Sequence, residues 1–238
     1  MSEFRPGSFQ MIPPVIKNLI IINGLVWLAE MTLGSNIAEW MFNMFALHDV
    51  HSALFKPHQL VTYMFLHDNH GFEHILFNMF ALWMFGSILE NYWGGKRFLV
   101  FYMVSGIGAA VCHLAVLYPE MSRVIEGLQQ EYSPEVIQNS LYSAGYPVNE
   151  ATLGASGAVF GCLAAFGYLF PNSEMFIIPI PFPVKAKWMV LGYAGIELFS
   201  GIRSSAGDNV AHWAHLGGGL VGLLLVMYWN RNNRRNFY

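Results

Sequence analysis

The stretches Gly154-Ala155-Ser156-Gly157 and Ala214-His215-Leu216-Gly217-Gly218 decide the expected fold, because each places a polar side chain inside an apolar run. The first stretch opens a run that ends near Phe170, and the second lies early in a run that ends near Trp229. A histidine at membrane depth is costly and by default indicates function. Small residues around both positions let two helices approach closely. We therefore expect two neighbouring helices that bring Ser156 and His215 together.

The composition indicates an integral membrane protein. Of the 238 residues, 55% are apolar and 11% are charged, whereas a soluble domain is about a quarter charged. The formal net charge of −3 gives no indication of nucleic-acid binding. Cys112 and Cys162 both lie in apolar runs and are expected to be packing residues rather than a disulfide.

Six apolar runs predict an all-α protein with six transmembrane helices, and several are shorter than the roughly 20 residues of a straight span. The runs cover residues 19–33 (lengthened by Val15 and Ile16), 71–89, 98–118, 153–170, 188–202 and 210–229. We expect a lead at 1–14, a six-span domain at 15–230 and a basic tail at 231–238. Residues 34–60 are amphipathic, as in an interfacial segment. Residues 119–152 are hydrophilic, with room for one or two short surface helices.

The lysines and arginines predict that both termini are cytoplasmic, as in a multi-pass protein of a bacterial inner membrane. With six spans, the side of the termini receives nine of the 12 cations, namely Arg5, Lys17, Lys96, Arg97, Lys185, Lys187, Arg231, Arg234 and Arg235. The outer side receives Lys56, Arg123 and Arg203. The second, fourth and sixth runs then start at the outer face. At 1.5 Å per residue, His74, Ser156 and His215 lie within about 10 Å of those starts.

The pairing of Ser156 with His215 predicts a catalytic dyad. A serine hydroxyl is a weak nucleophile and needs an adjacent base, and His215 can take its proton and return it to a leaving amine. Ser156 begins its helix, where free N–H groups favour developing negative charge. His212 is the rival base. Glycines make room for a peptide backbone and for the helix contact, at Gly154, Gly157, Gly218 and Gly222.

Other polar residues allow several interpretations. His74 and Asn78 share a helix face and either stabilise an oxyanion or hydrogen-bond between helices. His67, His70 and His74 lack the further ligands of a clear metal set, so we expect no metal and no cofactor. Glu197 suits a transport or proton-relay residue. Asp208 could orient a histidine as a third catalytic residue, although we expect a dyad.

The motifs together resemble the rhomboid intramembrane serine proteases over about residues 15–230. The matching stretches are His74-Ile75-Leu76-Phe77-Asn78, Gly154-Ala155-Ser156-Gly157 with Phe160, and Ala214-His215-Leu216-Gly217-Gly218 with Gly222. The resemblance implies a six-helix bundle whose short central fourth helix carries the nucleophile, Ser156. It further implies His215 as base, an oxyanion hole of His74, Asn78 and the Ser156 backbone N–H, and Phe160 packed beneath His215.

The resemblance also implies the partners, which are transmembrane protein substrates and membrane lipids. We expect cleavage in the transmembrane segments of single-span proteins, near the outer face of the membrane. Two alternatives remain. One is a catalytically weak rhomboid-like binding or quality-control protein, and the other is a small transporter, which would explain Glu197 and the glycines but not the site residues at one depth. His58-Gln59 replaces the Trp-Arg pair found in many members, and the 119–152 segment is long for a minimal bacterial member. The sequence gives no oligomeric state.

Overall fold

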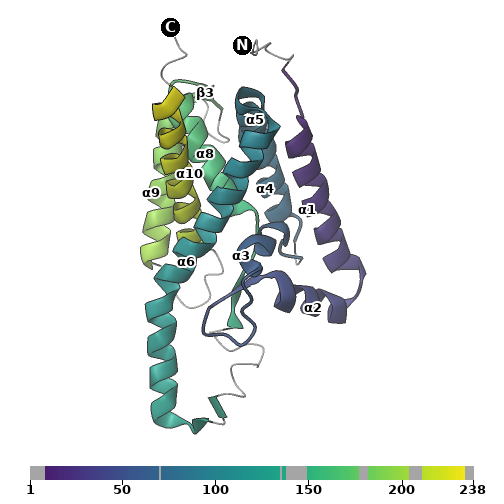
Figure 1. The fold of residues 1–238 in the computed structure, drawn as a ribbon, viewed down its shortest axis with the longest axis vertical. Coiled ribbons are helices and arrows are strands. Elements are labelled where there is room, and N and C mark those ends of the chain that lie inside the picture. Colours follow the sequence, from purple (N-terminus) through teal and green to yellow (C-terminus); the bar gives the residue numbers. More distant parts are fainter. Residues whose placement is uncertain are drawn as a thin grey trace.

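The computed structural model describes residues 9–69, 71–134, 136–137, 149–176, 182–203 and 211–233. The fold is a bundle of helices with four two-residue strands (Figure 1). The helical elements are α1 (Pro14–Thr32), α2 (Ser35–Phe45), α3 (Gln59–Thr62), η1 (Tyr63–Phe65), α4 (Glu73–Ala81), η2 (Leu82–Gly86), α5 (Ser87–Trp93), α6 (Gly95–Glu131), α8 (Ser156–Leu169), α9 (Ala186–Arg203) and α10 (His212–Asn233). The strands are β1 (Leu47–His48), β2 (Ala151–Thr152), β3 (Glu174–Met175) and β4 (Val184–Lys185).

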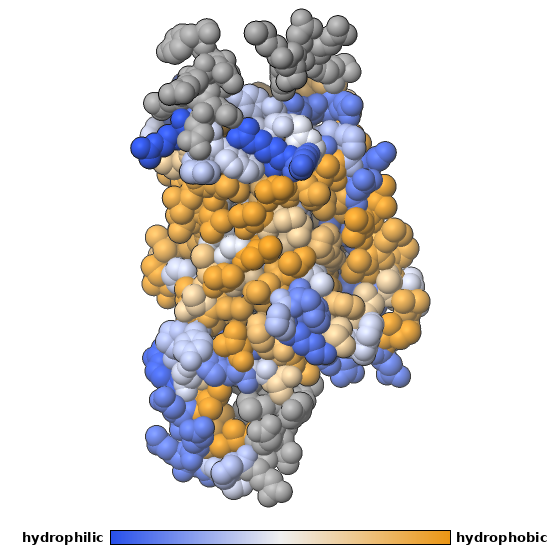
Figure 2. All heavy atoms as spheres, viewed as in Figure 1, coloured by the Kyte–Doolittle hydropathy of each residue, from blue (hydrophilic) through white to orange (hydrophobic). Residues whose placement is uncertain are grey.

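The surface of the bundle is apolar in its middle. Figure 2 shows a hydrophobic band between two hydrophilic ends on the face in view. By length and composition alone, α1 and α6 are each able to cross a membrane, while the apolar α8 has 14 residues. Large apolar side chains are exposed along the outer helices, for example Leu25 on α1, Ile196 on α9 and Leu224 on α10. An exposed apolar surface of this extent is typical of contact with lipid.

The centre of the bundle is α8, as the sequence predicts. Nine of its 14 residues are buried, and it packs against α6, α9 and α10. Its residues are mostly small, so neighbouring backbones lie close to it. By contrast, α9 is peripheral, with Ala186, Met189 and Gly201 as its buried residues. The short helix that begins at Ser156 is therefore held on several sides.

Two of the expected helices differ from the sequence interpretation. The second apolar run forms α4 and α5 joined by the π-helical turn η2 rather than one regular helix. The third run does not end at residue 118, and the short surface helices expected directly after it are wrong for residues 119–131. There α6 continues through Pro119 to Glu131, as one helix of 37 residues. Its length of about 55 Å exceeds the roughly 30 Å of a hydrocarbon core.

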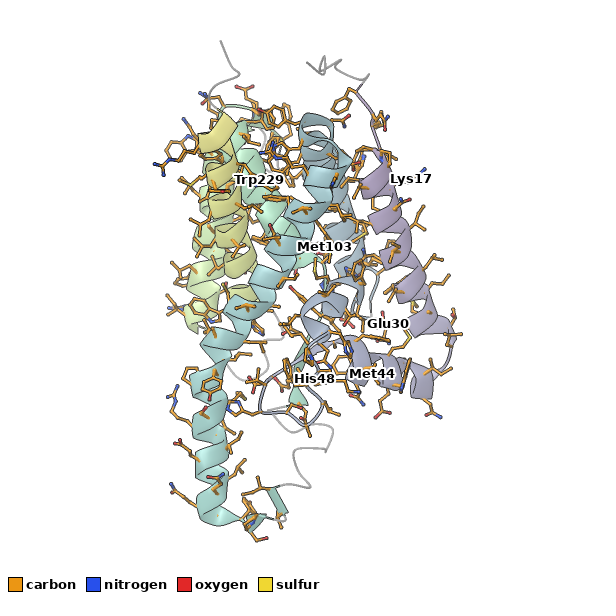
Figure 3. The ribbon with its side chains drawn as sticks, viewed as in Figure 1. Lys17, Glu30, Met44, His48, Met103 and Trp229 are labelled. Atoms are coloured by element: carbon orange, nitrogen blue, oxygen red, sulfur yellow. The ribbon has the colours of Figure 1, made fainter. Side chains whose placement is uncertain are left out.

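The two ends of the bundle carry different residues. Helix α1 begins and α10 ends at one end of the bundle (Figure 1), and Lys17 and Trp229 lie toward that end in Figure 3, whereas Glu30 and His48 lie toward the other. The Arg97 guanidinium lies 4.4 Å from the Trp229 ring centroid, so it shares the end with Trp229. Lys17 and Arg97 therefore lie at the same end of the bundle, while the cytoplasmic orientation of that end stays a prediction.

A buried amide organises the segment between α1 and α4. Gln59 is fully buried, and its Oε1 accepts from the backbone N–H groups of His48 at 3.3 Å and Lys56 at 3.1 Å. Its Nε2 donates to the Leu54 carbonyl at 2.9 Å. The neighbouring His58 ring bonds to the Met44 carbonyl at 2.8 Å. The His58-Gln59 pair thus ties together the segment that precedes the second apolar run.

Candidate active site

The chain that leads into Ser156 is fixed from three directions. Antiparallel pairing joins β2 to β1, with Thr152 opposite Leu47. The Thr152 hydroxyl lies 2.8 Å from the Nε2 of His113 on α6. The Gly154 N–H donates to the Tyr63 carbonyl at 2.9 Å. Gly154 has a φ of +122°, which a residue with a Cβ rarely adopts, so the glycine permits the turn into α8.

Ser156 and His215 form a hydrogen-bonded pair across 59 residues of sequence. The Ser156 Oγ lies 2.7 Å from the His215 Nε2. Donation from the hydroxyl to Nε2 assigns the imidazole proton to Nδ1. The Phe160 ring lies one turn after Ser156 and stacks on the imidazole, with centroids 4.4 Å apart and planes inclined by 6°. The stack fixes the plane of the ring, so His215 keeps Nε2 directed at the hydroxyl.

Glycine contacts set the separation of the helices that carry this pair. A Cβ on Gly218 of α10 would overlap the carbonyl group of Gly157 on α8. A Cβ on Gly222 would lie 2.7 Å from the Gly161 Cα. The backbones are in direct contact at both points, as small residues allow between membrane helices. The expected contact face of α10 is therefore present, and it brings His215 to Ser156.

His74 points its Nε2 at the space beside Ser156. Its Nδ1 accepts from the Asp68 N–H at 3.2 Å, which assigns the ring proton to Nε2. The position of a Cβ on Gly154 would lie 3.0 Å from that Nε2 and 3.7 Å from the Ser156 Oγ. The absent side chain at Gly154 thus leaves a space that an N–H donor and the serine hydroxyl both border.

Two further polar residues adjoin His74. The Asn78 Nδ2 donates to the His74 carbonyl at 2.9 Å, and the amide has a second N–H for another acceptor. The His67 ring lies 5.2 Å from the His74 ring, centroid to centroid. Burial, reinforced by the charge of His74, lowers the pKa of His67 to about 3. His67 is therefore a neutral packing partner of His74, while the third histidine of that set, His70, lies outside the described residues.

Glu197 on α9 lies between the two histidines of α10. Its Oε2 lies 2.6 Å from the His212 Nδ1 and 3.0 Å from the His215 Nδ1. His212, the rival base, therefore faces this carboxylate with its Nδ1, whereas His215 lies against the carboxylate with Nδ1 and against Ser156 with Nε2. The three side chains could also be metal ligands. Zinc bonds of about 2.0–2.1 Å would separate tetrahedral ligand atoms by about 3.3 Å, so distances of 2.6 and 3.0 Å favour proton-mediated contacts.

Two other features stand apart from this site. A cavity of about 660 Å³ is lined by Trp93, Lys96, Arg97 and Trp229. It lies at the end of the bundle that carries Lys17 and Trp229, and its lining includes neither Ser156 nor His215. Asp208, the acidic residue that the sequence offered as a third catalytic residue, lies outside the described residues.

Comparison with known proteins gives consistent matches. A family model described as Rhomboid domain matches residues 55–232. The chain is 29% identical over 163 residues to "Rhomboid protein 1, mitochondrial" of Saccharomyces cerevisiae, a match that covers 66% of this chain and 38% of that protein. It is 29% identical over 199 residues to "Rhomboid protease GluP" of Bacillus subtilis, covering 83% and 31%. It is 28% identical over 168 residues to "Rhomboid protease AarA" of Providencia stuartii, covering 68% and 52%. The chain spans between about a third and two thirds of the length of the curated relatives it matches.

Proposed function

Because the chain belongs to the rhomboid family of membrane-embedded proteins, we propose that it is an intramembrane serine endopeptidase with Ser156 as nucleophile and His215 as base. The observation that carries the proposal is the 2.7 Å contact between the Ser156 Oγ and the His215 Nε2. This contact joins Ser156, at the start of α8, to a histidine inside an apolar bundle. An ionisable side chain without a function is rare in such a place.

The pair supplies the proton transfers of peptide hydrolysis. The Ser156 hydroxyl proton passes to the His215 Nε2 as Oγ forms a bond to the substrate carbonyl carbon. Collapse of the tetrahedral intermediate breaks the C–N bond, and the Nε2 proton passes to the leaving amine. Water then gives a proton to the same nitrogen while its oxygen attacks the acyl ester. The second tetrahedral intermediate breaks the ester bond and returns the proton to Ser156, so both residues are regenerated.

The oxyanion of each tetrahedral intermediate needs donors that are already in place. The Ser156 backbone N–H is at the start of α8, where helical N–H groups have no acceptor within the helix. The His74 Nε2–H borders the space left by the absent side chain of Gly154. The second amide N–H of Asn78 is the third proposed donor. These groups support an oxyanion hole on the α4 side of Ser156.

We expect His74→Ala and Asn78→Ala to lower kcat by roughly ten- to a thousandfold with KM little changed. Oxyanion donors act mainly in the transition state, and losses of this size follow removal of one donor. Steady-state cleavage of a single-span substrate by purified protein in detergent measures both constants. Phe77→Ala, at an exposed position on the same helix, is the matched control. A rise in KM with kcat unchanged would show that these residues bind substrate or pack helices instead.

The proposed substrates are transmembrane segments of single-span proteins, cut near the outer face. A carbonyl inside an intact helix is hydrogen-bonded and sheltered, so the segment must unwind locally, and lipid penalises the freed backbone groups. Unwinding is easiest where glycine or proline weakens the helix and water is close. The expectation that Gly157 makes room for a peptide backbone is wrong, because a Cβ there would lie 2.5 Å from the Ala109 Cβ, so this glycine serves helix packing. Gly154 leaves room beside Ser156 for backbone. We therefore propose a small residue just before the cut.

The experiment that tests this proposal maps the product termini by mass spectrometry on a series of single-span substrates. We expect cuts near the outer boundary, after Ala, Gly, Ser or Cys, with helix-weakening residues following. Replacing the small residue by Phe should lower kcat/KM at that bond at least tenfold, because bulk there has no space. Cuts at the cytoplasmic boundary, or indifference to Phe, would contradict the proposed depth and specificity.

The proposed protease domain is longer than the region that the family model matches. Helix α1 precedes that region, yet Ile16 is fully buried in the core. The backbone N–H groups of Val15 and Ile16 donate to the Glu90 carboxylate at 3.0 and 2.9 Å. We therefore propose one six-span unit over residues 15–230, with both termini cytoplasmic in a cell membrane. Residues 1–14 and 231–238 are then the lead and the basic tail.

A further inference from the structure

Glu197 supplies a carboxylate to a site that is otherwise rich in histidine. His212 and His215 face it from α10. His74 on α4 borders the space beside Ser156, and His113 on α6 contacts Thr152 in the segment that leads to Ser156. Among these side chains, Glu197 is the one acid. The side chains of Glu197, His212 and His215 are 13%, 11% and 12% exposed, so solvent screens their interaction only partly.

In the proposed reaction the His215 Nδ1 carries a proton, and this N–H needs a hydrogen-bond acceptor. When Nε2 accepts the Ser156 proton, Nδ1 must carry the other ring proton. This Nδ1 is buried, and no aligned hydrogen bond reaches it within the described part of the chain. The Glu197 Oε2 is 3.0 Å away. Buried polar atoms generally have a hydrogen-bond partner, and this carboxylate oxygen is within hydrogen-bond distance of Nδ1.

We propose that Glu197 is a positioning residue that holds His215 in the Nδ1–H tautomer and stabilises its imidazolium form during the reaction. The inference rests on the proposed function and turns the Ser156–His215 dyad into a carboxylate-assisted triad. When Oγ attacks the substrate, the proton arrives on Nε2 and His215 becomes cationic beside the carboxylate. Glu197 forms no covalent bond and contacts no substrate atom in this step. An orienting carboxylate plays the same part in soluble serine proteases.

His212 holds the carboxylate in place. Its Nδ1 lies 2.6 Å from the Glu197 Oε2, a short hydrogen bond of the charge-assisted kind. His212 and His215 are three residues apart on α10, so their side chains lie on neighbouring faces of the helix. One carboxylate oxygen therefore bridges the two imidazoles. In this arrangement His212 supports Glu197 rather than acting as the base.

The test compares Glu197→Gln, Glu197→Asp and Ser156→Ala in the purified full chain, with a single-span substrate in detergent. Glutamine keeps the size of the side chain but removes its charge, and its NH₂ group can donate to Nδ1 and favour the wrong tautomer. We expect Glu197→Gln to lower kcat by about ten- to a thousandfold with KM unchanged, and Glu197→Asp to restore part of that loss. Leu198→Ala, exposed on the same helix, is the control and should keep wild-type kcat.

A second readout is independent of turnover. In protein labelled with ¹⁵N-histidine, NMR distinguishes the two imidazole tautomers, and His215→Asn identifies the signal. Wild-type His215 should be in the Nδ1–H form, and Glu197→Gln should shift it toward the Nε2–H form. The Nε2–H form in the wild-type protein would overturn the inference even if Glu197→Gln failed to fold.

The outcomes separate this inference from the proposed function. Wild-type kcat in Glu197→Gln, beside an inactive Ser156→Ala, would overturn the role of Glu197 and leave the serine protease intact. Full cleavage by Ser156→Ala would overturn the proposed function itself. A loss in Glu197→Gln that appears in KM with kcat unchanged would also overturn the inference, because a positioning carboxylate acts on the chemical step.

Discussion

Replacing Ser156 or His215 with alanine is expected to reduce cleavage of a single-span substrate to background while the protein stays folded. In the proposed mechanism the Ser156 hydroxyl forms the acyl ester. The His215 Nε2, 2.7 Å away, is the atom that takes the hydroxyl proton. In a soluble serine protease, loss of either residue lowers kcat by about 10⁶. The double variant should be no worse than either single one, because nucleophile and base act as a unit.

The measurement is kcat/KM in detergent for the wild type, the two single variants and the double variant, with thermal unfolding followed in parallel. His212→Ala is the comparison variant, because it removes an imidazole of the same helix whose Nδ1 lies against Glu197. It loses the support of Glu197 but leaves the base in place, so it should keep much more activity than His215→Ala. Cleavage by Ser156→Ala at the wild-type rate would remove the nucleophile from the mechanism, and the reverse order of the two histidine variants would exchange their roles.

Gly218→Ala is expected to lower activity at least a hundredfold and to destabilise the fold by about 1–3 kcal/mol or more, the usual range for overpacking. The added Cβ would overlap the backbone carbonyl of Gly157. A side chain can rotate away from such a contact, but a helix backbone can only shift. Since α8 and α10 must then separate, the 2.7 Å contact between Ser156 and His215 is lost with them.

The neighbouring glycine gives the control for this prediction. A Cβ on Gly219 would meet its nearest atom, the Phe160 carbonyl oxygen, at 3.8 Å, an ordinary contact distance. Gly219→Ala should therefore keep the activity and the unfolding temperature of the wild type, since alanine also favours the helix. Equal behaviour of the two variants would show that the close contact at Gly218 is not required.

The sequence predicted the features that depend on local pattern. Apolar runs located the helices, and the glycines near Ser156 and His215 indicated which helices meet. The family resemblance implied the stack of Phe160 on His215, which is present at 4.4 Å. These predictions succeeded because small residues in apolar helices mark close helix contacts, and a histidine in such a helix marks a functional site.

Other features depend on tertiary contacts that no local pattern reveals. The end of α6 was misplaced because Pro119 and the charged residues after it are typical of a helix end, yet the helix continues to Glu131. Glu197 was interpreted as a transport or proton-relay residue, because its histidine partners lie on another helix and no local pattern shows them. The separation between Glu197 and His215 becomes visible only when α9 and α10 pack together.

The order of the site residues along the chain has a consequence for biosynthesis. Ser156 precedes Glu197 and His215, and 59 residues separate the serine from its base. At about 5–20 residues per second, the ribosome needs roughly 3 to 12 s to make that stretch. During this interval the serine has been synthesised without the group that activates it. On the proposed mechanism, the nascent chain cannot cleave a peptide bond until α10 enters the bilayer and docks on α8, because the last helix supplies the base.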